Sequence, residues 1–247
     1  MSAEIIAAAV GIAFLAALCM STTGFGFALT MTPLLTLAWD VKAAVATSIV
    51  LSLLTVVPNL VEVRAHVVPT RVLIMLAGFV LGMPLGLLLF ERLDSNALKV
   101  FVAATVIVAS IVAYVSPTLR ITRNAGPLGV VAGAASGALG PSTSMNGPPV
   151  VLYLLGLDPS IERFRGTILA YFFPAGILTV TAFAIAGRIT GDVLLVVAAA
   201  LPALVLGTYA GVWLRKRLNP ESFRTIVLGV LITASIGLIA SAVGGLG

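Results

Sequence analysis

Charged residues are scarce in this chain of 247 residues, and their scarcity indicates the solvent. Only 9% of the residues are Asp, Glu, Lys or Arg, and 60% are hydrophobic, whereas soluble domains are roughly a quarter charged. The supply of 14 Lys and Arg with 9 Asp and Glu is too small to cover a water-soluble fold of this size. The sequence therefore predicts that a lipid bilayer surrounds most of the protein. It excludes soluble enzymes, nucleic-acid-binding proteins and disordered tails.

Cysteine and histidine are nearly absent. Cys19 is the single cysteine, which excludes disulfides within the chain and thiolate metal sites. His66 is the single histidine, which excludes a metal site built from histidines. We expect neither a metal nor another cofactor. Residues 1–4 contain no Lys or Arg, so the positive start of a signal peptide is missing, and we expect this segment to stay in the mature protein.

Eight long runs of the sequence contain no charged residue. Six of them have 19 to 23 residues, the length of one membrane-crossing helix. The first and the fifth are nearly twice as long, and a single helix of that length would extend about 50 Å, well beyond a hydrocarbon core of roughly 30 Å. These two runs must therefore fold back as helical hairpins. The runs are 5–39, 43–61, 72–90, 100–119, 124–157, 166–187, 193–214 and 225–247.

The order of one long run and three short runs occurs twice, and local motifs recur with it. Gly82-x3-Gly86-x5-Arg92 matches Gly207-x3-Gly211-x5-Arg217, and the pair Ala46-Thr47 resembles Gly166-Thr167. We therefore predict an all-α polytopic membrane protein made of two homologous repeats. Each repeat is a helical hairpin followed by three spans, about ten helical segments in one membrane domain. The repeats are residues 1–119, with hairpin 5–39, and residues 120–247, with hairpin 124–157.

The number of crossings and the positive charges predict the topology. A hairpin returns to its starting side and three spans follow, so the second repeat is inverted relative to the first. Ten of the fourteen Lys and Arg then lie on one side: Arg64, Arg71, Arg120, Arg123, Arg163, Arg165, Arg215, Lys216, Arg217 and Arg224. The other side receives Lys42, Arg92, Lys99 and Arg188. The positive-inside bias assigns the first set to the cytoplasm and both termini to the extracytoplasmic side.

Both hairpins have polar tips made of residue types that end and begin helices. Residues 21–27 read STTGFGF, and residues 136–149 read SGALGPSTSMNGPP. Ser, Thr and Asn cap helix N-termini, Pro begins helices, and Gly lets the backbone bend. We expect short helical arms, so that the two tips enter from opposite sides and face each other in the middle of the bilayer. Two opposed helix N-termini with free N–H groups would form a site for an anion.

The predicted binding site consists of the polar and small residues of the two tips. They are Ser21, Thr22, Thr23, Gly24, Gly26, Gly137, Gly140, Ser142, Thr143, Ser144, Asn146, Gly147 and Pro148. Five further residues are candidates for the pathway or its mouth: Thr47, Thr167, Tyr171, Arg163 and Arg165. A competing interpretation makes each tip a tight turn whose hydroxyls bond to their own backbone. For the two arginines it is positive-inside topology with a salt bridge to Asp158 or Glu162.

The order of these motifs resembles the TauE/SafE sulfite exporter family over essentially the whole chain. Its first-half signature resembles residues 24–27 (GFGF), 33–35 (PLL) and 46–48 (ATS), and its second-half signature resembles residues 137–140 (GALG), 147–149 (GPP) and 165–167 (RGT). The resemblance implies a bacterial inner-membrane carrier for sulfite, other sulfur oxyanions or organosulfonates, with export in some members and uptake in others. The first tip departs from the family's commoner run of consecutive glycines at Phe25 and Phe27, which leaves the substrate open.

These observations together predict a secondary transporter for a small sulfur-containing anion, sulfite or an organosulfonate. The two repeats would alternate access to a midplane site. Export is favoured because an inside-negative potential contributes about 2.3 kcal/mol per charge per 100 mV. The alternatives are an anion channel, a non-transporting scaffold subunit, and an intramembrane enzyme. The enzyme would need paired carboxylates, a Ser/His arrangement or a metal cluster, which the neutral runs lack, so we expect no catalytic residue.

Small residues at four-residue spacing predict close packing between helices. Gly78, Gly82 and Gly86 form one such stripe, and Gly207 and Gly211 form another. This spacing lets two helix backbones approach each other in lipid. We expect the stripes to pack inside one protomer, with a homodimer contact as the alternative use.

Overall fold

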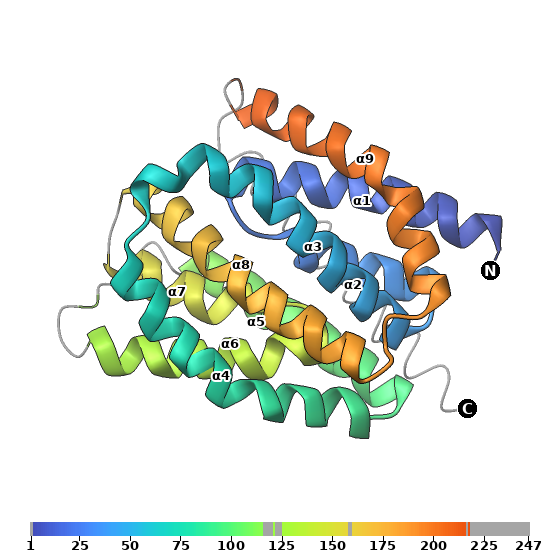
Figure 1. Ribbon diagram of the computed structural model, residues 1–247, viewed down its shortest axis with the longest axis horizontal. Helices are drawn as coiled ribbons and strands as arrows, with labels where there is room; N and C mark the ends of the chain where they lie inside the picture. Colours follow the sequence, from blue (N-terminus) through green and yellow to red (C-terminus); the bar gives the residue numbers. More distant parts are fainter. Residues whose placement is uncertain (1, 116–120, 122–124, 158–159, 216, 218–247) are drawn as a thin grey trace.

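The computed structural model describes residues 2–115, 121, 125–157, 160–215 and 217. Over these residues the chain is all-helical, as predicted, and contains no strand (Figure 1). The predicted span 225–247 and most of the junction between the two repeats lie outside the described residues. The elements in order are α1 (Ala3–Thr23), α2 (Phe27–Ala38), α3 (Val41–Val63), the 3-10 helix η1 (Arg64–His66), α4 (Pro69–Arg92), α5 (Ser95–Val115), α6 (Ala125–Thr143), α7 (Gly147–Leu157), α8 (Ile161–Ile185) and α9 (Gly191–Arg215).

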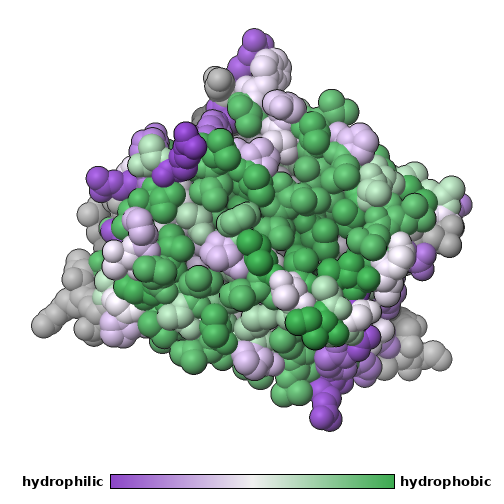
Figure 2. Space-filling model, viewed as in Figure 1, coloured by the Kyte–Doolittle hydropathy of each residue, from purple (hydrophilic) through white to green (hydrophobic). Residues whose placement is uncertain are grey.

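Among the described residues, five segments are long and apolar enough to cross a membrane: α1, α3 with η1, α4, α8 and α9. Their outward surfaces carry large apolar side chains such as Leu81, which is 71% exposed, and Ile185, which is 84% exposed. Figure 2 shows apolar residues over most of one face of the molecule, with hydrophilic residues gathered toward its edges. Side chains of this kind belong in lipid rather than in water. The chain is therefore a multi-pass membrane protein.

Both long neutral runs fold as hairpins, but the two arms of each hairpin are unequal. Helix α1 has 21 residues and α2 has 12, while α6 has 19 and α7 has 11. The expectation of short arms is therefore wrong for α1 and α6. At 1.5 Å per residue α1 extends about 30 Å, the thickness of a hydrocarbon core, whereas α2 extends about 18 Å. The turn lies off centre in each run, so α2 and α7 are the half-length helices that begin at the tips.

Glycines bring two pairs of helices into backbone contact. A Cβ atom added at Gly82 would lie 1.9 Å from the carbonyl oxygen of Ala134, so α4 and α6 leave no space for a side chain there. A Cβ atom added at Gly207 would lie 2.3 Å from the carbonyl oxygen of Phe14, so α9 packs against α1 in the same way. Both stripes of small residues thus pack inside the chain, as expected.

Each of these pairs joins the two predicted repeats. Helix α4 of the first repeat packs on α6 of the second, and α9 of the second packs on α1 of the first. Figure 1 shows the two pairs on opposite sides of the molecule, with α3 and α8 between them. The glycines that match in the sequence motif therefore make equivalent contacts in the two halves. This pairing supports the division into repeats, which stays a prediction, as does their inversion.

We expect Gly82→Ala to destabilise the protein because its methyl group would push α4 away from α6. Overpacking of this kind costs about 1–3 kcal/mol or more. Gly11→Ala is the matched control, since Gly11 lies within α1 and an added Cβ atom there meets nothing within 4 Å. Thermal unfolding of the purified protein should show a lower midpoint for Gly82→Ala and an equal or higher one for Gly11→Ala. Equal midpoints for the two variants would contradict the packing argument.

Candidate functional site

The first tip is a turn of three residues that depends on two glycines. Gly24 ends α1 with φ +88°, and its N–H donates to the carbonyl oxygen of Met20 at 2.7 Å. Gly26 precedes α2 with φ +102° and gives that helix no side-chain cap. Both φ values lie in the left-handed region that favours glycine. The first turn of α2 therefore presents backbone N–H groups with no capping side chain.

The second tip is also a turn of three residues, but only one of them has a left-handed backbone, and that residue is a serine. Ser144 has φ +66°, and its N–H donates to the carbonyl oxygen of Gly140 at 2.7 Å, just as Gly24 donates one turn back. A left-handed backbone costs a residue with a Cβ atom about 1–2 kcal/mol. Strain of this kind persists where the surrounding structure imposes it, and it is concentrated at functional sites. Ser144 is thus a stronger candidate than a glycine would be, because it brings a hydroxyl to the tip.

Four of the predicted site hydroxyls are used by the turns themselves. The hydroxyl of Thr23 donates to the carbonyl oxygen of Cys19 at 2.9 Å and accepts from the N–H of Phe25 at 3.3 Å. Thr143 makes the equivalent pair of bonds in the second tip. Two further hydroxyls donate to carbonyl oxygens in the preceding helical turn, those of Thr22 and Ser142. For these four residues the structure agrees with the interpretation as a tight turn.

Other buried polar atoms in and around the tips have no hydrogen-bond partner among the described residues. Buried polar groups are normally paired, so a cluster of unpaired ones marks a place where a polar ligand can bind. The hydroxyls of Ser21 and Ser144 belong to the tips themselves. The other such atoms are Thr30 Oγ1 and Thr32 Oγ1 of α2, Thr47 Oγ1, Ser48 Oγ and Asn59 Oδ1 of α3, and Arg165 Nε of α8.

The two tips meet in the interior of the protein. Gly26 and Phe27 of the first tip line one cavity together with Asn146 of the second tip, Ser52 of α3 and Phe172 of α8. The predicted approach of the two tips is therefore present in the structure.

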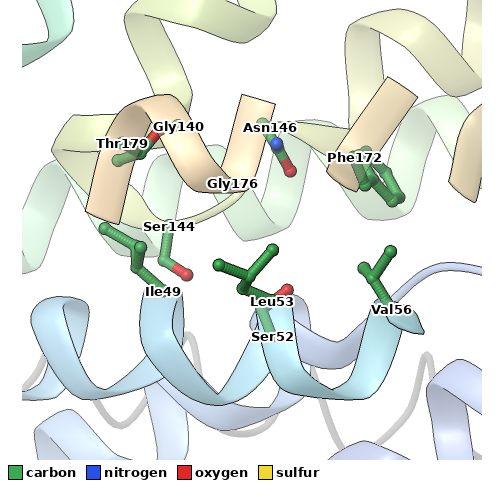
Figure 3. Close-up of a pocket in the computed structure, with 10 residues that line it drawn as sticks. All are labelled: Ile49, Ser52, Leu53, Val56, Gly140, Ser144, Asn146, Phe172, Gly176 and Thr179. Atoms are coloured by element: carbon green, nitrogen blue, oxygen red, sulfur yellow. The ribbon is translucent and has the colours of Figure 1, made fainter. Parts of the chain in front are cut away.

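A second cavity shares Ser52, Asn146 and Phe172 and adds Ser144 and Thr179 (Figure 3). Ser144 and Asn146 point across it toward α3 (Figure 3). Each of the two cavities measures about 20 Å³, which is room for about one water molecule. The structure therefore shows the tips in a closed arrangement, and a larger anion requires them to separate.

Four of the candidate pathway residues are buried: Arg165, which is described below, and Tyr171, Thr167 and Thr47. The hydroxyl of Tyr171 donates to Ser136 Oγ at 2.6 Å, and Ser136 Oγ donates to the backbone oxygen of Asn146. These two bonds connect α8 through α6 to the second tip. The hydroxyl of Thr167 accepts from the N–H of Val68 at 3.1 Å and ties α8 to the start of α4. Thr47 is fully buried with an unpaired hydroxyl.

Of the remaining candidates in the second hairpin, one packs against a neighbouring helix and two line the cavities. A Cβ atom added at Gly137 would lie 2.2 Å from the carbonyl oxygen of Phe79, so Gly137 serves the contact with α4 and not the tip. Gly140 faces Asn146, and Gly147 lies beside Phe172 in the first cavity. Pro148, the second residue of α7, has no N–H group, so its backbone cannot donate to an anion.

Arg165 is buried against the first tip, whereas Arg163 is exposed. Arg165 is 6% exposed, and its Cγ atom is 3.0 Å from where a Cβ atom of Gly24 would stand. Its guanidinium donates to the carbonyl oxygen of Ser21 at 3.4 Å. Arg163 is exposed on the same helix.

Among the described residues, Arg165 forms its ion pair with Glu62 and not with Glu162, one of the two acidic residues expected from the sequence. The carboxylate of Glu62, at the end of α3, lies 4.0 Å from the Arg165 guanidinium. Glu162 is exposed in the first turn of α8, and Asp158 lies outside the described residues. Glu62 reaches Arg165 because α3 packs along α8.

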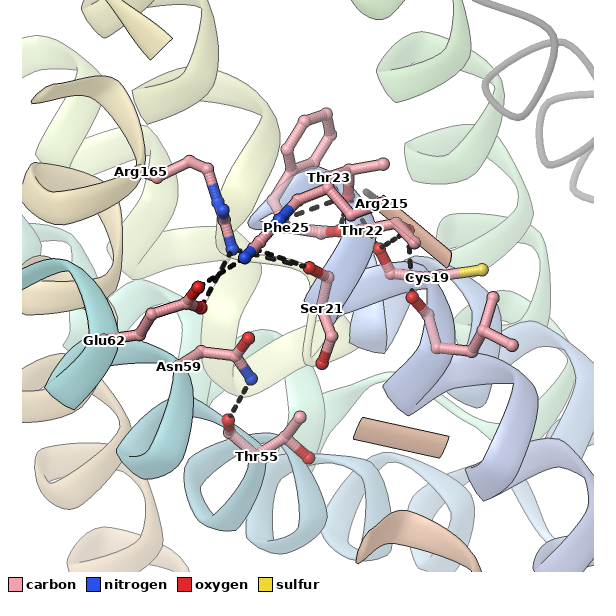
Figure 4. Close-up of polar contacts among 11 residues, drawn as sticks. Cys19, Ser21, Thr22, Thr23, Phe25, Thr55, Asn59, Glu62, Arg165 and Arg215 are labelled. Carbon is pink, nitrogen blue, oxygen red and sulfur yellow. Dashed lines mark hydrogen bonds and ion pairs between the residues drawn. The ribbon is translucent and has the colours of Figure 1, made fainter. Parts of the chain in front are cut away.

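Arg215 joins this cluster, and the sequence did not single it out as a site residue. It comes from the end of α9, donates to the same carbonyl oxygen of Ser21 at 3.2 Å and pairs with Glu62 (Figure 4). The cluster assembles from three helices that are far apart in the chain. The sequence did show that Glu62, Arg165 and Arg215 each border a neutral run, at the end that the topology places on the same side of the membrane.

Comparison with known proteins identifies the family. No curated protein and no solved structure matches the chain. A family model described as sulfite exporter TauE/SafE matches residues 9–238, which is most of the chain and includes both tips and the arginine cluster. The match agrees with the resemblance drawn from the motifs. The chain therefore belongs to the sulfite exporter TauE/SafE family, whose members are membrane transporters.

Proposed function

We propose that the protein is a secondary carrier that exports a small sulfur-containing anion, sulfite or an organosulfonate, across the bacterial inner membrane. Family membership supports transport of this class. The observation that carries the proposal is the meeting of two helix tips at cavities lined by Asn146 and Ser144, with the Ser144 hydroxyl buried and unpaired. Such a site offers an anion hydrogen-bond donors without a fixed positive charge.

The two tips would contribute different donors. In the first turn of α2, Phe27, Ala28 and Leu29 carry backbone N–H groups without intrahelical acceptors. In α7 the second and third residues are prolines, which removes two of the equivalent donors. The hydroxyl of Ser144 and the amide of Asn146 would replace them. The site would thus combine backbone donors from one tip with side-chain donors from the other.

The helix pairs suggest which bodies would move in alternating access. The first hairpin is attached to α9 and the second hairpin to α4, by glycine contacts that leave no space between backbones. Each moving body would therefore contain helices from both repeats, α1–α2 with α9 and α6–α7 with α4. Separation of these bodies on one side and then on the other would open the closed cavities in turn. Outward movement of the anion would be driven by the inside-negative potential.

Reconstituted protein should move sulfite by a carrier mechanism. Uptake of sulfite into proteoliposomes should saturate with concentration, and internal unlabelled sulfite should accelerate uptake of labelled sulfite by counterflow. An outside-positive potential should speed exit of the anion. Liposomes without protein are the control. Non-saturating flux with single-channel steps would favour the anion channel, and absence of flux for sulfite and organosulfonates alike would reject the transporter proposal.

Ser144 variants should separate binding from stability. Ser144→Ala and Ser144→Gly both remove the hydroxyl, and we expect each to weaken sulfite binding about tenfold, since a hydrogen bond to a charged group contributes about 1.5–3 kcal/mol. Ser144→Gly should be more stable than Ser144→Ala by about 1 kcal/mol, because glycine adopts the left-handed backbone without strain. Titration of the thermal unfolding midpoint with sulfite measures both effects.

Ser110→Ala is the control for the loss of a buried serine hydroxyl. Ser110 is buried in α5, its hydroxyl donates to the carbonyl oxygen of Val106 at 2.9 Å, and it lines neither of the two cavities at the tips. This variant should bind sulfite like the unaltered protein. Unchanged affinity in both Ser144 variants would remove that hydroxyl from the site.

A further inference from the structure

Two arginines and one glutamate gather at the first tip, and their charges do not balance. Arg165 and Arg215 both face Glu62 and both donate to the carbonyl oxygen of Ser21 (Figure 4). The three side chains together carry a net charge of +1, and the carboxylate of Glu162, exposed in the first turn of α8, also acts electrostatically on Arg165. Among the described residues, Glu62 is the one carboxylate within ion-pair distance of these two arginines. Two buried or half-buried cations that share one carboxylate are costly, so an additional anion in direct contact with them would be stabilised.

The hydrogen-bonding capacity of the arginines is also only partly used. A guanidinium has five N–H donors in a planar fork. The Nε atom of Arg165 is buried and has no partner among the described residues, and its bond to Ser21 is long at 3.4 Å. The amide oxygen of Asn59 and the hydroxyl of Ser21, both near the cluster in Figure 4, are buried and unpaired as well. The cluster thus has hydrogen-bonding capacity beyond the contacts that it makes.

The exposed fraction of the three side chains decreases from the surface toward the first tip. The side chain of Glu62 is 39% exposed, that of Arg215 is 20% exposed and that of Arg165 is 7% exposed. Arg165 then contacts Gly24, the residue that ends α1. Glu62, the most exposed of the three, lies at the end of the bundle that the predicted topology assigns to the cytoplasm, where an exported anion would bind first.

On the basis of the function proposed above, we propose that Arg165 and Arg215 form a second oxyanion site at the inner mouth, and that Glu62 is its resident competitor. The carboxylate of Glu62 presents two oxygens to the guanidinium groups, as a sulfite or sulfonate group would. An arriving oxyanion displaces Glu62 from Arg165 and Arg215, and Glu62 returns after the anion has moved on to the tips. The ligand class is an oxyanion with two or more exposed oxygens.

A purely structural role for the cluster makes a different prediction. Cations near the C-terminal end of a helix stabilise its last carbonyl groups, and the two arginines do bond to the end of α1. If this were their whole contribution, changes at Glu62 would alter the stability of the ligand-free protein and leave its affinity for sulfite unchanged. If Glu62 competes with the substrate, its neutralisation increases the affinity.

The test is the variant Glu62→Gln in the purified full-length protein, with sulfite titrated at constant ionic strength against the thermal unfolding midpoint. We expect the Kd for sulfite to fall about fivefold, the lower end of typical coupling between two ligands. Glu91→Gln is the matched control. Glu91 pairs with Arg188 at the end predicted to face outward, and both side chains are exposed by more than a third. This control should leave the Kd unchanged.

A second variant keeps the proposal testable if Glu62→Gln does not fold. Arg215→Lys retains the charge but loses the two-pronged donor geometry, so we expect a Kd for sulfite about tenfold higher. An unchanged Kd in Arg215→Lys, or a Kd in Glu62→Gln no lower than in Glu91→Gln, would overturn the second site. If the Ser144 variants weaken binding while both mouth variants bind like the unaltered protein, the proposed function stands and this inference fails. If the unaltered protein shows neither a sulfite-dependent midpoint nor flux, the proposed function fails as well.

Discussion

Peptide groups in lipid have no water to bond with, and this constraint organises the whole structure. A chain that turns inside the membrane must bury the turn within protein or line a wet cavity with it. Here both turns lie between helices, at Gly24–Gly26 and at Ser144–Asn146, and the helices around them must approach closely enough to exclude lipid. The glycines of α4 and α9 make that approach possible. Close helix packing and a polar interior are thus two results of the same requirement.

The sequence predicted the parts of the fold that depend on length and residue type. Runs 5–39 and 124–157 are too long for one crossing, so their hairpins could be predicted from the thickness of the bilayer. Gly24, Gly26 and Ser144 could be predicted to lie at the turns because Gly and Ser belong to the few residue types that end or begin helices. The lengths of the arms could not be predicted, since a neutral run does not show where inside it the turn lies. The hydrogen bonds from the hydroxyls of Thr22 and Thr23 to their own helix could also be predicted, because threonine commonly bonds to nearby backbone carbonyl groups.

The candidate site was harder to predict because it depends on contacts between distant segments. Arg165 appeared as a candidate, but Glu62 and Arg215 join it only because α3 and α9 end where α8 begins. Gly137 belongs to the same polar stretch as the second tip, and only the packing of α6 on α4 assigns it a different role. The two turns also differ in backbone geometry, since Gly24 and Gly26 are both left-handed in the first whereas Ser144 is the one left-handed residue in the second.

The exchange of helices between the two halves has a consequence for biosynthesis. Helix α1 ends at Thr23, and its partner α9 begins at Gly191, so most of the chain leaves the ribosome before the two can meet. At 5–20 residues per second, this interval lasts about 10 to 30 s. During that time the face of α1 that α9 will cover, which includes Phe14 and Ala17, has no permanent neighbour, and the first hairpin has to be held by lipid or by the insertion machinery. Assembly of the transporter therefore finishes only when its last-made helices arrive.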